Sequence, residues 1–315
     1  MNKRIVIAGG SGFLGQRLEH YFAGHGWDVI ILTRTAEREN NRIQWDGRTL
    51  GNWAAELEGA AAIVNLSGRT VDCRYNARNR TEIMQSRVES TRVIAEAIAH
   101  CAKPPRVWLN ASTATLYKHT RGPAWDENGE TGATAEANDE FSIEVGRAWE
   151  TEFLKSPLVG TRKITLRTAM VLGLGKNSVF PVLRKLVRCG LGGKQGTGQQ
   201  FVSWVHEEDF CRAVEWLIER DEAAGVFNLC APNPLTNTEM MRAFRQLLRV
   251  HFGVPAPKWV LEIGAIFLRT ETELVLKSRR VIPGKLLMMG FQFRFARFQQ
   301  AIFNLNTTLQ TRFVP

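Results

Sequence analysis

A glycine-rich turn near the start of the chain constrains the fold more than any other segment. An apolar run from Ile5 to Ala8 is followed by glycines at every third position, Gly9, Gly12 and Gly15, and then by an amphipathic segment. This order predicts a strand, a tight turn and a helix. Gly9 would permit the sharp turn, Gly12 would leave open space beside it, and Gly15 would let the helix pack against its strand.

A turn of this kind is typical of a dinucleotide-binding site. The first N–H groups of a helix have no partner within the helix, and the helix N-terminus has a partial positive charge, so together they attract a pyrophosphate. The residues that we expect to bind such a cofactor here are Gly9, Ser11, Gly12, Phe13, Leu14 and Gly15. The alternative is an ordinary glycine-rich turn.

The pattern along the chain predicts an α/β protein with a Rossmann-like, doubly wound parallel sheet. Strands are expected at 4–8, 28–33, 61–66, 106–111 and 163–167, and helices at 12–23, 80–100 and 139–154. After Gly173 the rhythm changes, and a strand at 200–205, a helix at 207–220 and a strand at 226–229 precede a largely helical remainder. We therefore expect a dinucleotide-binding domain at 1–175, with 206–230 returning to it, and a smaller, mixed, largely helical domain at 176–315.

Composition excludes several classes of protein. The net charge is +10, but the Lys and Arg residues are dispersed, which favours a basic surface with a pocket for a polyanionic ligand over nucleic-acid binding. The five scattered cysteines predict reduced thiols in the cytoplasm and no metal site. No apolar run has the length of a signal sequence or a membrane span, so no membrane partner is expected.

The end of the second strand indicates which dinucleotide would bind. An acidic residue in this place usually binds a free ribose 2′-hydroxyl, but here the strand runs into Thr33 and Arg34. A guanidinium pairs well with a 2′-phosphate, so NADP(H) is preferred over NAD(H). Arg38 would add a second positive charge. In the alternative interpretation, Arg34 is merely an exposed basic residue after a strand.

In its glycine turn and in the order of its strands and helices, the chain resembles the extended short-chain dehydrogenase/reductase superfamily of nucleotide-sugar epimerases, dehydratases and reductases. Four later segments match its landmarks in order: 65–68, 111–117, 166–173 and 203–209. The first resembles the superfamily's cofactor turn after the fourth strand, which implies cofactor contacts for Leu66, Ser67 and Gly68. In the second segment, Thr113 aligns with the catalytic Ser/Thr of the superfamily. Tyr117 is then a candidate acid or a residue of the pocket wall.

The other two landmarks and one helix supply further candidates. Arg167 ends a strand and is a candidate for cofactor or anion binding. His206 is a candidate proton donor on the substrate side, although the histidine of this segment is more often bonded to backbone. Arg87 is a candidate for binding an anionic substrate, with a solvated surface residue as the alternative.

One landmark of the superfamily is missing. The catalytic Tyr-x-x-x-Lys belongs about 25 residues after Thr113, where one alignment gives Ser142 and Gly146 and a one-residue shift gives Phe141 and Val145. None of the three tyrosines in the chain is followed by lysine four positions later. The usual acid–base group is therefore absent.

This departure resembles an atypical subgroup, the epimerase-family or SulA-like proteins, in which Phe-x-x-x-(Val/Cys)-x-x-x-Trp-Glu replaces that motif. Segments 74–92, with Arg74-Tyr75 and Ser86-Arg87-Val88, and 278–293 also fit the subgroup. The resemblance then spans nearly the whole chain, but it implies no defined reaction.

Two functions from different classes follow. The first is an NADP(H)-binding oxidoreductase or sugar-nucleotide epimerase-like enzyme with non-standard catalytic residues, Thr113 and Tyr117, acting on a small, anionic molecule. The second is an NADP(H)-binding sensor or interaction protein without turnover. An approach of Tyr117 or His206 to the nicotinamide would favour the enzyme. We expect a cytoplasmic protein and a homodimer in either case.

Overall fold

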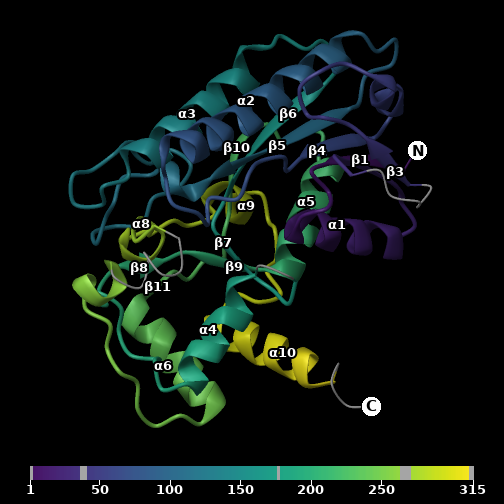
Figure 1. Cartoon of the computed structure of the whole chain (residues 1–315). Helices are drawn as coiled ribbons and strands as arrows, with labels where there is room; N and C mark the ends of the chain where they lie inside the picture. Colours follow the sequence, from purple (N-terminus) through teal and green to yellow (C-terminus); the bar gives the residue numbers. More distant parts are fainter. Residues whose placement is uncertain (1–2, 36–40, 176–177, 263–270, 312–315) are drawn as a thin grey trace.

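A parallel sheet of seven strands forms the centre of the computed structural model, which describes residues 3–35, 41–175, 178–262 and 271–311 (Figure 1). The strands are β1 (Arg4–Ala8), β2 (Asp28–Thr33), β3 (Arg42–Gln44), β4 (Ala62–Asn65), β5 (Val107–Thr113), β6 (Arg162–Thr168) and β10 (Gly225–Leu229). Their order is β10-β6-β5-β4-β1-β2-β3. The chain therefore winds outward in both directions from the β1–β4 pair, and the carboxyl ends of these two strands form the crevice where such sheets bind ligands.

The strands are apolar because helices cover both faces of the sheet. Ile5, Val6 and Ile7 are all completely buried, and β1 pairs in parallel with β2 on one side and β4 on the other. Ile5 and Ile7 belong to one hydrophobic core, whereas Val6 and Ala8 belong to a second core on the opposite face. A strand buried on both faces has a continuous apolar run, which is the pattern of 5–8.

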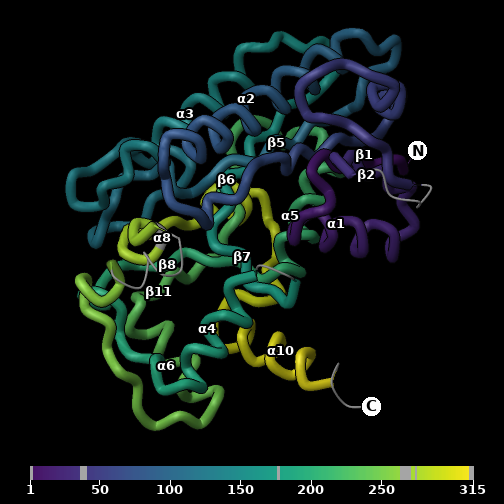
Figure 2. Tube along the Cα trace, in the orientation of Figure 1, coloured from purple at the N-terminus to yellow at the C-terminus, as the bar shows by residue number. Residues whose placement is uncertain are grey.

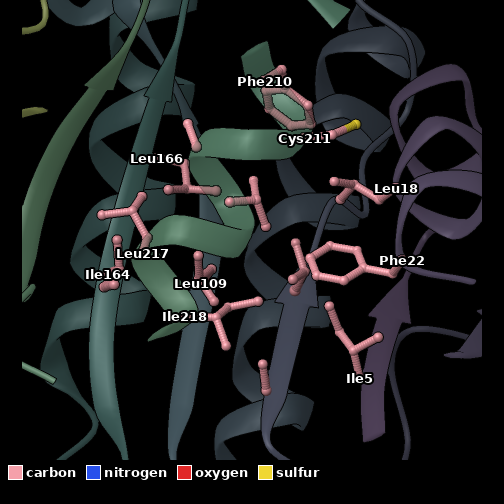
Figure 3. Close-up of a cluster of buried hydrophobic side chains, with 14 of the residues drawn as sticks. Ile5, Leu18, Phe22, Leu109, Ile164, Leu166, Phe210, Cys211, Leu217 and Ile218 are labelled. Atoms are coloured by element: carbon pink, nitrogen blue, oxygen red, sulfur yellow. The ribbon is translucent and has the colours of Figure 1, made fainter. Parts of the chain in front are cut away.

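Two groups of helices contribute to these cores. On one face lie α1 (Phe13–Gly24) and α5 (Glu207–Glu219), which place Leu18, Phe22, Phe210 and Leu217 against the sheet (Figure 3). On the other face lie the short η1 (Asn52–Leu57), α2 (Ala77–Ala99) and α3 (Glu140–Lys155). The Rossmann-like α/β fold expected from the sequence is thus present.

The second part of the molecule lies below the sheet in Figures 1 and 2 and has its own core. It contains the paired strands β7 (Met170–Leu172) with β9 (Trp204–His206) and β8 (Phe201–Val202) with β11 (Leu235–Thr236). Its helices are α4 (Val179–Arg188), α6 (Asn237–Leu248), α8 (Glu273–Leu276), α9 (Gly284–Met288) and α10 (Phe298–Thr311). The C-terminal region is therefore largely helical.

The two parts are interleaved along the chain. β10 pairs with β6 at the edge of the central sheet. Leu286 and Phe291, from the C-terminal region, belong to the same core as β1 and α5. The strand predicted at 200–205 is two short strands separated at Ser203, whose Oγ accepts a hydrogen bond from Val281 N–H at 2.7 Å.

Within the described ranges, no helix has both the length and the apolar character needed to cross a membrane.

Candidate functional site

Two adjoining cavities lie at the carboxyl ends of the strands. The outer cavity, of about 1330 Å³, extends past the ends of β2 and β3, and the inner cavity, of about 460 Å³, extends between the end of β5 and α3. Both are lined by Gly9, Gly12, Leu66, Gly68 and Thr70. Because they share this wall, they form one groove that crosses the glycine turn.

The three glycines of the turn have different steric roles. Gly9 has a φ of +75°, and a Cβ there would lie 2.9 Å from the Cα of Ser67. At Gly12 a Cβ would meet nothing closer than the Gly9 carbonyl oxygen at 3.7 Å, so its open side faces the groove. At Gly15 a Cβ would lie 2.3 Å from the Cα of Gly10. The close approach at Gly15 is therefore to the backbone of the turn that follows β1.

The N-terminus of α1 is suited to an anion. Gly12 is the N-cap, no side chain caps this end, and the first turn has no acidic residue. Phe13 and Leu14 line the inner cavity and Ser11 lines the outer one. Free N–H groups and the helix dipole at this point favour a phosphate.

The outer cavity contains the two residues that end β2. Thr33 is buried, and its Oγ1 accepts a hydrogen bond from Thr35 N–H at 3.4 Å. Arg34 is exposed and lines the cavity, whereas Arg38 lies outside the described residues. Asp46 also lines it, but its carboxylate accepts two backbone N–H groups of the following turn, and these bonds lower its pKa. The cation at the end of β2 therefore faces the groove.

The turn after β4 is fixed by a buried amide network. Asn65 Oδ1 accepts a hydrogen bond from Ser67 N–H at 3.0 Å, and Asn65 Nδ2 donates to Asn110 Oδ1 at 2.8 Å. Leu66 and Gly68 line both cavities, and Ser67 lines the outer one. Ser67 Oγ is buried and has no hydrogen-bond partner among the described residues, so it is available to a ligand.

The inner cavity brings together the end of β5 and the helix that lacks the expected motif. Thr113 lines it, and its Oγ1 accepts a hydrogen bond from Thr115 N–H at 3.1 Å, capping the short helix η2 (Ala114–Leu116). From α3, the lining residues are Phe141, Ser142, Val145, Gly146 and Trp149. Both alignments of the missing motif therefore place it at the cavity.

Gly146, one of the two positions aligned with the absent lysine, has little room for a side chain. A Cβ at Gly146 would lie 2.7 Å from Cδ2 of the buried Leu116. A lysine at this position would require Leu116 to move. The packing of Leu116 therefore suits a glycine at position 146 and leaves little room for a larger residue.

Tyr117 and Arg167 lie outside both cavities, which corrects their expected roles. Tyr117 is 1% exposed and its hydroxyl donates to Asn228 Oδ1 at 2.8 Å. Arg167 binds both carboxylate oxygens of Glu150 at 2.8 Å, and its guanidinium lies 5.0 Å from the ring centroid of Tyr117. The turn at η2 directs Tyr117 toward β10, so that the two residues form a buried structural group.

His206 is likewise structural rather than a proton donor on the substrate side. It is 2% exposed, and its Nδ1 accepts a hydrogen bond from Glu208 N–H at 3.1 Å as the N-cap of α5. Its ring stacks on Phe295 with centroids 3.9 Å apart. Burial lowers its pKa to about 4, so the neutral imidazole needed for capping is the stable form near neutral pH.

Arg87 lines the inner cavity, as a substrate-side residue would. Its Nη1 donates to the backbone oxygens of Arg69 at 3.1 Å and Ile83 at 3.0 Å, and its guanidinium lies 5.1 Å from the ring centroid of Trp149. Among the described contacts it has no carboxylate partner. Burial lowers its pKa to about 10, so it stays charged at neutral pH.

Several polar residues of the inner cavity were not among the sequence candidates, and Tyr75, Thr115 and Glu273 are three of them. The Ser142 hydroxyl donates to Glu273, which comes from α8. Burial raises the pKa of Glu273. Tyr75 lies in a segment that fits the subgroup pattern, but nothing local in the sequence marks Glu273. Within the described ranges, no group of three or more His, Cys, Asp or Glu residues is arranged to hold a metal ion.

Comparisons with known proteins identify the family of the chain. Residues 5–230 match the model of the NAD dependent epimerase/dehydratase family, and residues 256–305 match a domain of unknown function, DUF1731. The chain is similar to epimerase family protein SDR39U1 of Bos taurus, with 29% identity over 95% of this chain and 98% of that protein. Epimerase family protein YfhF of Bacillus subtilis is 26% identical over 96% of this chain and 97% of that protein.

A solved structure resembles the whole chain. The crystal structure of human SDR39U1 with NADPH has a TM-score of 0.85 and 28% identity, covering 96% of this chain and 99% of that one. Because the epimerase model matches well over half of the sequence, the chain belongs to the NAD dependent epimerase/dehydratase family.

Proposed function

We propose that this protein binds NADP(H) in the groove and reduces a carbonyl group of a small, anionic molecule. The observation that carries the proposal is the end of β2, where Thr33 and Arg34 face the outer cavity in place of an acidic residue. The similar human protein crystallised with NADPH supports the same cofactor.

The groove provides a site for each charged part of the cofactor. The uncapped N-terminus of α1 at Gly12 would bind the pyrophosphate, and Arg34 would pair with the 2′-phosphate. Ser67, which lines the outer cavity, adds a buried hydroxyl without a partner among the described residues. The inner cavity, beyond the glycine turn, is where the nicotinamide end would lie.

The inner cavity contains groups suited to carbonyl reduction. NADPH, when bound, supplies a hydride. The Thr113 hydroxyl at the end of β5 would hydrogen-bond the substrate oxygen and polarise the carbonyl group. Arg87 would attract a negatively charged substituent, because its charge has no carboxylate partner among the described contacts.

A binding protein without turnover is the second candidate. Tyr117 and His206 both lie outside the inner cavity, so neither expected proton donor would reach a substrate there. If no other side chain donates a proton, NADP(H) binding would serve sensing or interaction. A cytoplasmic location and a homodimer are part of either proposal, and size-exclusion chromatography with light scattering tests the dimer.

The choice of cofactor is tested by titrating the wild-type protein and the Arg34→Ala variant, each with NADPH and with NADH, and comparing the dissociation constants. Arg34→Ala should remove a charge-assisted bond worth about 1.5–3 kcal/mol. The affinity for NADPH should therefore fall about 10- to 150-fold, and the affinity for NADH should stay unchanged. Arg220→Ala, at an exposed arginine that ends α5, is the matched control. Equal affinities of the wild type for both cofactors would refute the proposal.

A further inference from the structure

The orientation of Tyr75 gives it an unused hydroxyl at the inner cavity. Its ring packs edge to face against Phe141, with centroids 4.9 Å apart, and its backbone N–H donates to Glu271 at 2.8 Å. Its Oη is buried and has no partner at normal hydrogen-bond distance and angle among the described residues; the polar side chain beside it is Ser142, whose hydroxyl proton is donated to Glu273. A buried phenol that is held in place without a partner needs one, and the adjoining cavity is where a ligand would supply it.

The other two tyrosines are already engaged. Tyr21 donates to Glu215 at 2.7 Å, and Tyr117 donates to Asn228 at 2.8 Å. Neither lines the inner cavity, whereas Tyr75 does. Of the three tyrosines in the chain, Tyr75 is therefore the one placed to donate a proton into it.

A cation lies near this phenol, although it comes from α2 rather than α3. Arg87 lines the same cavity and is held against Trp149 of α3. Tyr75 and Arg87 both line this cavity, and a negative charge on Tyr75 would raise the pKa of Arg87. Neither position aligned with the lysine supplies a cation: one is Val145, and the other is Gly146, where a Cβ would approach Leu116. The positive charge of the missing motif is thus present but comes from a different helix.

We propose that Tyr75 and Arg87 together replace the absent Tyr-x-x-x-Lys pair, with Tyr75 as the proton donor to the substrate oxygen and Arg87 as the neighbouring cation. This inference rests on the proposed binding of NADP(H). NADPH, when bound, would supply the hydride for the new C–H bond at the carbonyl carbon, and Tyr75 would give up its O–H proton to the carbonyl oxygen. The substrate becomes an alcohol, the dinucleotide is oxidised, and solvent returns the proton to the phenolate.

The groups around Tyr75 keep its hydroxyl protonated at neutral pH. The titratable and charged groups that face it are Cys73 on its own segment, Arg87 on α2, Glu271 and Glu273 near α8, and Arg279. Burial, with the charge of Glu273, raises the pKa of Tyr75 to about 12. The phenol is therefore protonated at neutral pH, which is the form that a donor requires. Arg87 would stabilise the phenolate that the reaction leaves.

The first test locates Tyr75 relative to the cofactor and needs no substrate. Protein labelled with carbon-13 at tyrosine Cζ gives one NMR signal for each of its three tyrosines, assigned with Tyr75→Phe and Tyr21→Phe. Saturating NADPH should shift the Tyr75 signal and leave that of Tyr21 unchanged. An unmoved Tyr75 signal in protein that binds NADPH would overturn this inference alone. Absence of NADPH binding by the wild type would overturn the proposed function and this inference with it.

The second test measures NADPH oxidation with a panel of 2-oxo acids and neutral ketones. Tyr75→Phe should lower kcat about 10²- to 10⁴-fold with the Kd for NADPH unchanged, because a positioned general acid contributes about that much. Tyr21→Phe is the matched control. Arg87→Met should also lower kcat, and Arg87→Lys should restore part of it. Wild-type turnover by Tyr75→Phe would overturn the assignment.

Discussion

Gly12 and Gly15 lie one helical turn apart, yet their substitution should have opposite consequences. Gly12→Val places a side chain where the nearest atom to its Cβ is 3.7 Å away, in a backbone conformation (φ −78°) that any residue adopts. Its cost to folding should be no more than about 1 kcal/mol, because glycine is a better N-cap than an apolar residue by less than the loss of about 1 kcal/mol seen when Ser or Asp is replaced by Ala. The side chain would, however, occupy the space expected for the pyrophosphate.

Gly15→Ala adds one carbon, but that carbon would lie 2.3 Å from Gly10 Cα and 2.5 Å from its carbonyl oxygen. Backbone atoms cannot rotate away, so the turn must shift. Overpacking of this kind costs about 1–3 kcal/mol, and the obstacle here places the expected loss at the upper end.

Urea unfolding followed by circular dichroism, combined with NADPH titration by fluorescence, separates the two effects. Gly12→Val should unfold with a free energy no more than about 1 kcal/mol below wild type and bind no NADPH. Gly15→Ala should lose about 3 kcal/mol. Wild-type NADPH affinity in folded Gly12→Val would refute the assignment of the helix N-terminus to the pyrophosphate. Wild-type stability of Gly15→Ala would refute the close approach to Gly10.

Three other perturbations follow from buried polar groups. Tyr117→Phe should cost about 1–2 kcal/mol, because Asn228 Oδ1 loses its donor, and calorimetric titration should show unchanged NADPH affinity. Lys277→Met should destabilise by about 3–5 kcal/mol in urea unfolding, because it leaves the carboxylate of Asp139 buried without its cation; a loss below 1 kcal/mol would contradict this. Because folding lowers the pKa of His206 to about 4, the unfolded chain binds the proton more readily, and stability should fall as pH drops from about 6.5 to 4. His206→Asn, which keeps an N-cap acceptor, should flatten this part of the stability profile; an unchanged slope would show that other groups cause it.

The parts of the fold encoded by neighbouring residues could be predicted from the sequence. The bounds of β1 and β2 agree with those predicted, since each strand is an apolar run that ends at a turn or a polar residue. The glycine turn and Arg34 line the groove where strand order and spacing placed them.

The inner cavity could be predicted only in part, because it depends on contacts between distant segments. Thr113 lies at the end of its strand as expected, but the turn at η2 directs Tyr117 away from the cavity. Ser142 contacts Glu273, 131 positions later, through packing of the C-terminal region that no local pattern encodes. Tyr75 precedes α2 and becomes a candidate only when its free hydroxyl and the cavity are seen together.

A crystal structure with NADPH bound tests the central claim most directly. We expect the pyrophosphate at the N-terminus of α1 beside Gly12, the 2′-phosphate within hydrogen-bond distance of Arg34, and the nicotinamide in the inner cavity facing Tyr75 and Thr113. A 2′-phosphate directed away from Arg34, or a nicotinamide outside the inner cavity, would contradict that claim.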